Sequence, residues 1–190
     1  MLAALRSVVS RVDASVFYWV VAHRSSLLNQ TMIVLGHAGA LVWSLGALVL
    51  ALVIRRRSQG LFQVALAIGL AALLADFAAK PLIARHRPVV SFTDIEVMAK
   101  PQRSGSFPST HAGGAFAAAF GLSRVLPEAR VALWILAVLV AYARVYLGVH
   151  YPIGVIGGAV IGMGAAGFAI GGTTWGSSRY AGRTHSKVGR

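Results

Sequence analysis

Residues 152–172 read PIGVIGGAVIGMGAAGFAIGG, and this stretch decides the class of fold. It carries no charged side chain over roughly the 20 residues that a helix needs to cross the hydrocarbon core of a bilayer. A spanning segment must satisfy its own backbone hydrogen bonds, and runs rich in Gly, Ala and Leu do so as helices, not as barrel strands. Four further apolar runs accompany it: Thr31–Ile54, Gly60–Lys80, Ser109–Leu126 and Arg130–Leu147. The sequence therefore predicts an all-α fold, a polytopic membrane helix bundle with five transmembrane helices.

The composition agrees with this class. Hydrophobic residues make up 57% of the chain and the mean hydropathy is +0.71, which is more apolar than a soluble domain needs. The net charge of +13 would suggest nucleic acid in a soluble protein. Here the cations lie at the ends of apolar runs, where membrane topology and anionic head groups explain them, so no nucleic-acid partner is expected. The chain has no Cys, which excludes disulfides, thiolate nucleophiles and Cys metal sites.

The two ends of the chain differ from the apolar runs. Residues 5–24, LRSVVSRVDASVFYWVVAHR, mix apolar residues with Arg6, Arg11 and Arg24, which predicts an N-terminal interfacial amphipathic helix, with a sixth span as the alternative. Residues 173–190 form a polar, basic tail that we expect to be unstructured. No internal repeat is visible, and residues 1–190 are expected to form a single domain.

Loop charges suggest an orientation. The cations divide equally between the two faces, but Arg55–Arg57 are concentrated in one short loop, which places that face in the cytoplasm. The longest loop between spans, Pro81–Pro108, then lies on the extracytoplasmic side and is expected to act as a lid or rim.

Three short stretches fall on that same face under the five-span topology: KPLIARHRP at 80–88, PSTH at 108–111 and ARVYLGVHYPIG at 143–154. They would bring Lys80, Arg87 and Arg144 to one pocket. Unpaired cations are costly near a bilayer, and a dianionic phosphate would neutralise them through paired donors. Ser109 suits the N-cap of the next helix, whose free N–H groups would also favour an anion.

Two histidines complete this set. Among His111 and His150, one neutral imidazole can attack phosphorus and one imidazolium can protonate the leaving oxygen. Carboxylates are too few for a two-metal site, so we expect phosphoryl transfer without a metal or other cofactor, with cation clamps stabilising the transferring group.

The spacing of these residues resembles that of the type 2 phosphatidic acid phosphatase superfamily. Lys80 is followed after six residues by Arg87-Pro88, then by PSTH, and Arg144 is followed after five residues by His150; the likeness covers about residues 76–160. The resemblance implies a nucleophilic His150 that forms a phosphohistidine, and His111 as general acid. It also implies phosphate binding by Lys80, Arg87, Ser109, Thr110 and Arg144.

Two positions depart from the family pattern. Thr110 stands where a Gly is usual, which matters little to a backbone amide. Gly154 stands where the family places an Asp, four residues after the nucleophile, that fixes the tautomer of the imidazole and stabilises its cationic form. A water, a backbone carbonyl or Asp76 is the alternative partner for His150, although the stronger expectation for Asp76 is that it pairs with Lys80. The recurring small residues Gly154, Gly158, Gly162 and Ala166 predict close packing against another helix.

The function expected from this resemblance is that of a membrane lipid phosphatase in the plasma membrane, with its site on the extracytoplasmic side. A polyprenyl pyrophosphate, undecaprenyl pyrophosphate, is the first expected substrate, and phosphatidic acid or phosphatidylglycerol phosphate is the alternative. Because of Gly154, a catalytically weak protein that binds or moves a lipid phosphate is a further alternative. The lipid substrate and the bilayer are the expected partners. Arg85 is expected to be an interfacial anchor that reaches the head groups.

Overall fold

The computed structural model describes residues 2–37, 58–100 and 104–185, and these are helical or in loops, without a strand among them. The helices are α1 (Leu2–Ala22), α3 (Ser58–Leu73), α4 (Lys80–Ile83), α5 (Pro88–Ser91), α6 (Thr110–Val125), α7 (Arg130–Tyr146) and α8 (Pro152–His185). A π-helical turn, Leu74–Ala79, joins α3 to α4, a 3₁₀ turn, Pro127–Ala129, precedes α7, and residues 26–37 are also helical. The predicted all-α fold is confirmed.

Three helical runs are long and apolar enough to cross a membrane: Gln59–Ser91, Pro127–Tyr146 and Pro152–Gly172. They coincide with three of the predicted spans. Helix α6 coincides with a fourth, and Ser109 is its N-cap as predicted. Most of the first predicted span, Thr31–Ile54, lies outside the described residues, as do Arg55–Arg57, so the number of spans and the orientation stay predictions.

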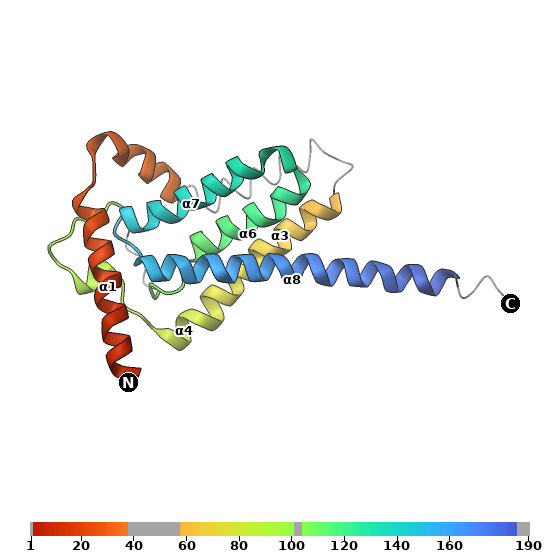
Figure 1. Ribbon diagram of the computed structural model, residues 1–190, viewed down its shortest axis with the longest axis horizontal. Helices are drawn as coiled ribbons and strands as arrows, with labels where there is room; N and C mark the ends of the chain where they lie inside the picture. The colour runs from red at the N-terminus through yellow and green to blue at the C-terminus, as the bar shows by residue number, and fades with distance from the viewer. Residues whose placement is uncertain (1, 38–57, 101–103, 186–190) are drawn as a thin grey trace.

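Helix α6 forms the centre of the bundle and packs against α3, α7 and α8 (Figure 1). Small residues bring α6 and α8 together, as the sequence predicts. A Cβ built on Gly158 would lie 2.3 Å from the carbonyl oxygen of Ser109, and one on Gly162 would lie 2.1 Å from that of Gly113. Neither distance leaves room for a side chain. The two backbones therefore approach each other closely, and this fixes the start of α6 beside the start of α8.

Helix α1 crosses the end of the bundle at which α7 ends and α8 begins (Figure 1). It buries Asp13, Phe17 and Val20, whereas Val12 and Trp19 on its other side are 58% and 60% exposed. It is not among the runs apolar enough to span. This transverse placement with one buried side is the arrangement expected of an interfacial helix.

The C-terminal tail corrects one expectation. Helix α8 continues to His185, so residues 173–185 are helical and the prediction of an unstructured tail is wrong for them. Once a helix has formed, each added residue gains a backbone hydrogen bond, and this favours propagation past the apolar part. Figure 1 shows α8 projecting beyond the rest of the bundle at the end opposite α1.

Candidate active site

His150 lies in the turn between α7 and α8 and is 1% exposed. The turn is closed by hydrogen bonds from the backbone N–H groups of Val149 and His150 to the carbonyl oxygen of Arg144, at 3.3 and 3.2 Å. Gly148 has φ +79°, a left-handed conformation that favours glycine. The side chain of Arg24 donates to the carbonyl of Tyr146 at 2.7 Å and so fastens the end of α7. The local sequence therefore turns the imidazole inward.

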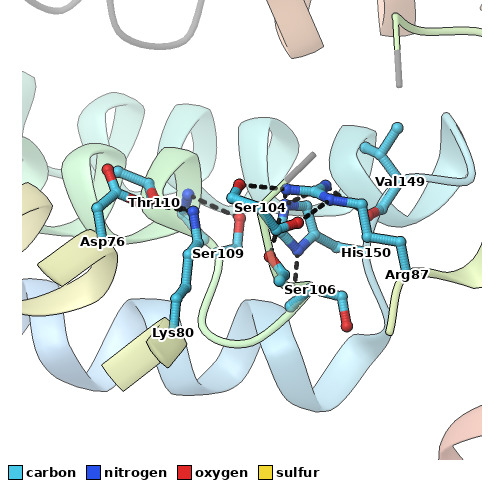
Figure 2. A network of polar contacts seen from close by, with 11 residues as sticks. Asp76, Lys80, Arg87, Ser104, Ser106, Ser109, Thr110, Val149 and His150 are labelled. Atoms are coloured by element: carbon cyan, nitrogen blue, oxygen red, sulfur yellow. Dashed lines mark hydrogen bonds and ion pairs between the residues drawn. The ribbon is translucent and has the colours of Figure 1, made fainter. Parts of the chain in front are cut away.

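The partners of His150 determine its tautomer. Nδ1 lies 2.8 Å from the carbonyl oxygen of Ser106, and Nε2 lies 3.3 Å from Nη1 of Arg87 (Figure 2). A carbonyl can only accept and a guanidinium can only donate. Nδ1 therefore carries the proton, and Nε2 presents its lone pair to the guanidinium of Arg87. This is the tautomer that a nucleophilic imidazole needs.

Arg87 is held by main-chain oxygens. Its Nε donates to Ser104 at 2.8 Å, and its Nη1 donates to the carbonyl of Val149 at 2.9 Å. Its Nη2 lies 3.3 Å from both the hydroxyl of Ser104 and the carbonyl of Gly105. The guanidinium is 3% exposed and is aimed at the imidazole of His150 (Figure 2). The loop before α6 thus orients both Arg87 and His150.

Lys80 belongs to a second polar group on the other side of Ser109 (Figure 2). Its ammonium contacts Asp76 at 2.5 Å and the hydroxyl of Thr110 at 2.9 Å, and that hydroxyl donates to Asp76 at 2.7 Å. Asp76 therefore pairs with Lys80, as the sequence predicts, and among the described residues its side chain bonds to Lys80 and Thr110, not to His150. A π-helical turn contains Asp76, and such turns are frequent at functional sites.

Arg144 is a buried cation without a compensating acid. It is 3% exposed, its Nη1 donates to the carbonyl of Gly36 at 2.6 Å, and its Nε has no hydrogen-bond partner among the described residues. All five acidic residues of the chain lie in the described ranges, where the two ion pairs are Lys80–Asp76 and Arg85–Asp13. A buried charge left in this state is costly, and an anion in the pocket would compensate it.

The start of α6 completes the arrangement. Ser109 accepts a hydrogen bond from the N–H of Ala112 at 3.4 Å and donates its own N–H to the carbonyl of Gly154 at 2.8 Å. His111 follows in the first turn of α6. The structure thus brings every predicted site residue to one end of the bundle: Lys80, Arg87, Ser109, Thr110, His111, Arg144 and His150.

The same surroundings keep His150 uncharged. Burial lowers the pKa of His150 well below its usual range, the positive charges of Arg87 and Arg144 lower it further, and the hydrogen bond to Ser106 opposes them in part. A neutral imidazole with an unprotonated Nε2 is a competent nucleophile over the physiological range of pH.

Two neighbouring hollows open at this end of the protein. One, of about 420 Å³, is lined by Asp76, Lys80 and Arg87. The other, of about 450 Å³, lies between α1 and the loop and is lined mainly by apolar residues, among them Val9, Ile83 and Ile153. They share three residues, Ala84, Arg85 and His86. A charged hollow next to an apolar one suits an amphipathic ligand. Among the described residues, no three His, Asp or Glu side chains cluster as metal ligands do.

Arg85 corrects a second expectation, because it is not an anchor that reaches out to the head groups. Its guanidinium pairs with buried Asp13 of α1 at 2.6 Å and lies 4.1 Å over the ring of Tyr151. Asp13 also accepts the N–H of Ile153 at 2.8 Å, in the first turn of α8. Sequence reasoning missed Asp13, and it allowed a backbone carbonyl as the partner of His150 without identifying Ser106 as its source. The isolated acid in an otherwise basic N-terminal helix was a signal for the first, whereas a main-chain carbonyl has none.

Comparisons with known proteins point in one direction. A family model described as the PAP2 superfamily matches residues 60–176. The chain is 32% identical to a lipid A 4'-phosphatase of Bacteroides thetaiotaomicron over 52% of this chain and 47% of that protein, so it spans about half the length of this relative. It is 25% identical to the undecaprenyl-diphosphatase BcrC of Bacillus subtilis over 74% of this chain and 72% of that protein.

Two solved structures resemble the protein over most of both chains. The crystal structure of Aquifex aeolicus LpxE matches with a TM-score of 0.74 and 25% identity, over 83% of this chain and 93% of that one. That of the transmembrane PAP2 type phosphatidylglycerolphosphate phosphatase from Bacillus subtilis matches with a TM-score of 0.71 and 28% identity, over 88% and 87%.

Proposed function

The chain belongs to the PAP2 superfamily, and from this premise we propose that it is a multi-pass membrane phosphatase that removes phosphate from a lipid. One observation carries the proposal. Buried Arg144 lacks a compensating acid among the described residues, and it stands beside a histidine whose partners leave Nε2 unprotonated. A tetrahedral phosphate would supply the missing negative charge and would meet the nucleophile at the same place.

The proposed reaction has two displacements. Lys80, Arg87 and Arg144, with the N-terminus of α6, bind the non-bridging oxygens of the phosphate. Nε2 of His150 attacks the terminal phosphorus, the bond from that phosphorus to the oxygen of the departing lipid breaks, and His111 gives its proton to that oxygen. In a lipid pyrophosphate this is the oxygen that bridges the two phosphorus atoms, so the lipid leaves as its monophosphate. The negative charge of the bound phosphate favours the imidazolium form of His111 that this step needs.

The second displacement returns the site to its first state. Water attacks phosphorus of the phosphohistidine, His111 takes the proton of the water, and the bond from phosphorus to Nε2 breaks to release inorganic phosphate. Nδ1 keeps its proton and its hydrogen bond to Ser106 through both steps. The cation clamps stabilise the transferring group in each transition state, and no step in this proposal uses a metal or another cofactor.

Undecaprenyl pyrophosphate is the first candidate substrate. The undecaprenyl-diphosphatase BcrC matches this chain over 72% of its own length, whereas the lipid A 4'-phosphatase is matched over 47%. Phosphatidylglycerol phosphate, phosphatidic acid and lipid A are the alternatives. We further propose that the site opens on the extracytoplasmic side of the plasma membrane, with α1 lying along that surface.

A catalytically weak protein that binds a lipid phosphate is the second candidate. Gly154 motivates it, because the family acid is missing there. The Nδ1 proton of His150 nevertheless has an acceptor, the carbonyl of Ser106 at 2.8 Å. This contact favours the enzyme over the binding protein.

Phosphate release from a panel of these lipids, in detergent micelles and with EDTA present, tests the proposal. The wild type should release phosphate, His150→Ala should release none above background, and His23→Ala, which removes an exposed histidine directly after α1, should match the wild type. Equal release by His150→Ala would overturn the mechanism. Saturable binding of a lipid phosphate by a wild type that releases no phosphate would establish the binding role instead.

A further inference from the structure

The backbone of Gly154 lies against the carbonyl of Ser106, beside His150. If the proposed function holds, this contact bears on how the imidazole is oriented without the family acid. A Cβ built on Gly154 would lie 2.6 Å from the carbonyl oxygen of Ser106 and 3.8 Å from Nδ1 of His150. A side chain at 154 would therefore point at Nδ1, the atom that the family acid would serve. The Ser106 carbonyl already occupies that space and accepts the Nδ1 proton at 2.8 Å.

We propose that the main-chain carbonyl of Ser106 is the positioning group for His150 in this protein, and that Gly154 is the residue that leaves room for it. The carbonyl does the geometric work of an acid, because it fixes the ring orientation and keeps the proton on Nδ1. It carries a dipole and no net charge, so it stabilises the imidazolium less than a carboxylate does. The missing acid is therefore replaced and not merely lost.

The carbonyl is itself held from both sides. The N–H of Ser106 donates to the carbonyl of Arg85 at 2.8 Å, and its hydroxyl donates to the carbonyl of His86 at 2.7 Å. Ser106 is fully buried. Arg85 is in turn anchored to α1 through Asp13, which also contacts the first turn of α8. The position of the carbonyl thus depends on a network that joins α1, the loop and α8.

This arrangement predicts the opposite of a simple missing-acid explanation. If an absent carboxylate limited the rate, Gly154→Asp would raise turnover. Under the proposal, any side chain at 154 displaces the Ser106 carbonyl and lowers turnover, and Gly154→Ala should do so with a single methyl group.

The experiment compares Gly154→Ala with Gly164→Ala, a glycine of the same helix at which a Cβ would meet nothing within 4 Å. We expect kcat for the lipid substrate to fall about 30-fold or more in Gly154→Ala, the scale seen when the group that orients a functional histidine is removed. KM, and inhibition by inorganic phosphate, should stay within about threefold, because the cation clamps remain. Gly164→Ala should match the wild type.

A second variant keeps the test decisive if Gly154→Ala does not fold. Incorporating the α-hydroxy analogue of phenylalanine at Phe107 turns the Ser106–Phe107 linkage into an ester, which weakens the Ser106 carbonyl as an acceptor and adds no atoms at 154. We expect kcat to fall about tenfold with phosphate inhibition unchanged, which corresponds to about 1.4 kcal/mol and lies within the range for weakening one buried hydrogen bond.

The outcomes separate this inference from the proposed function. If the wild type releases no phosphate from any lipid, the proposed function fails first. If the wild type is active and Gly154→Ala equals Gly164→Ala, or Gly154→Asp raises kcat, or the ester variant keeps the wild-type kcat, the role of the Ser106 carbonyl is overturned and the phosphatase stands.

Discussion

Replacing Arg144 with methionine should raise the thermal stability of the protein and abolish phosphate release. The guanidinium is 3% exposed, lacks an acidic partner among the described residues, and has one hydrogen bond, from Nη1 to the carbonyl of Gly36. Its Nε has none. When no anion is bound, the protein is less stable with Arg144 than without it. We therefore infer that Arg144 serves to bind an anion.

The magnitude follows from these contacts. Removing a buried, unsatisfied Nε recovers about 1–3 kcal/mol, and removing the charge itself recovers more. Losing the hydrogen bond to Gly36 lowers the free energy of unfolding by about 1.5–3 kcal/mol, which offsets part of this gain. Replacing buried ionic groups by apolar residues of similar volume is often stabilising by about 1–4 kcal/mol, and we take about 2 kcal/mol. At about 2–4 °C per kcal/mol for a chain of this size, Tm should rise by about 4–8 °C.

Thermal unfolding in detergent, with and without inorganic phosphate, measures both the stability of the variant and its stabilisation by the anion. Phosphate at one hundred times its Kd should stabilise the wild type by about 2.7 kcal/mol and should stabilise the variant much less. Phosphate release should fall by about 100-fold or more, as when one donor to a developing anion is removed. Arg124→Met removes an exposed cation at the other end of α6 and should change stability by less than about 0.5 kcal/mol.

A lower Tm in Arg144→Met than in the wild type would refute the reasoning. It would mean that Arg144 is compensated within the protein and is a structural residue. Equal stabilisation of both proteins by phosphate would refute the phosphate-binding role of Arg144, because the anion would then bind elsewhere.

Two further expectations concern pH and α1. Because burial and the charges of Arg87 and Arg144 hold the pKa of His150 well below its usual range, protonation should silence the nucleophile only at correspondingly low pH. The acidic limb of kcat/KM assigned to this residue should thus lie well below about 6.5, the ordinary histidine value, and a limb at or above that value would contradict the assignment. Asp13→Ala should lose about 3 kcal/mol of stability, since it breaks a buried ion pair and removes the cap on Ile153. Asp13→Asn keeps a capping oxygen and should lose less, and equal thermal shifts for the two variants would show that the charge carries the whole effect.

The helices that position the site could be predicted from the sequence because their boundaries carry local signals. Ser109 caps α6 and Pro152 begins α8, and in both cases the apolar run starts at the next residues. The spacing of Gly158 and Gly162 predicts that another helix packs closely against α8, but it does not identify that helix as α6. The gathering of the cations followed from topology, because alternate ends of spanning helices lie on the same face.

The network around Ser106 could not be predicted, for a physical reason. A main-chain carbonyl exists at every residue, and only the path of the loop decides which one reaches the imidazole. The pairing of Arg85 with Asp13 joins segments far apart in the chain, and Arg85 taken alone has the pattern of an interfacial anchor. The polar composition of residues 173–185 does not signal that α8 continues through them, because a helix that has already formed propagates beyond its apolar part.

The departure at Gly154 is also electrostatic, and this sets its consequence for catalysis. A carboxylate at that position would oppose the charges of Arg87 and Arg144 at His150, raising the basicity of the imidazole and weakening the positive field that attracts phosphate. The Ser106 carbonyl orients the ring and leaves that field intact, so the nucleophile stays neutral and the pocket stays strongly cationic. The Ser106 carbonyl, however, stabilises the positive charge that develops on the imidazole during attack less than a carboxylate would. A site built in this way should bind a phosphate anion tightly relative to its rate of turnover, and inhibition by inorganic phosphate should accordingly weaken wherever a variant brings a carboxylate to the imidazole.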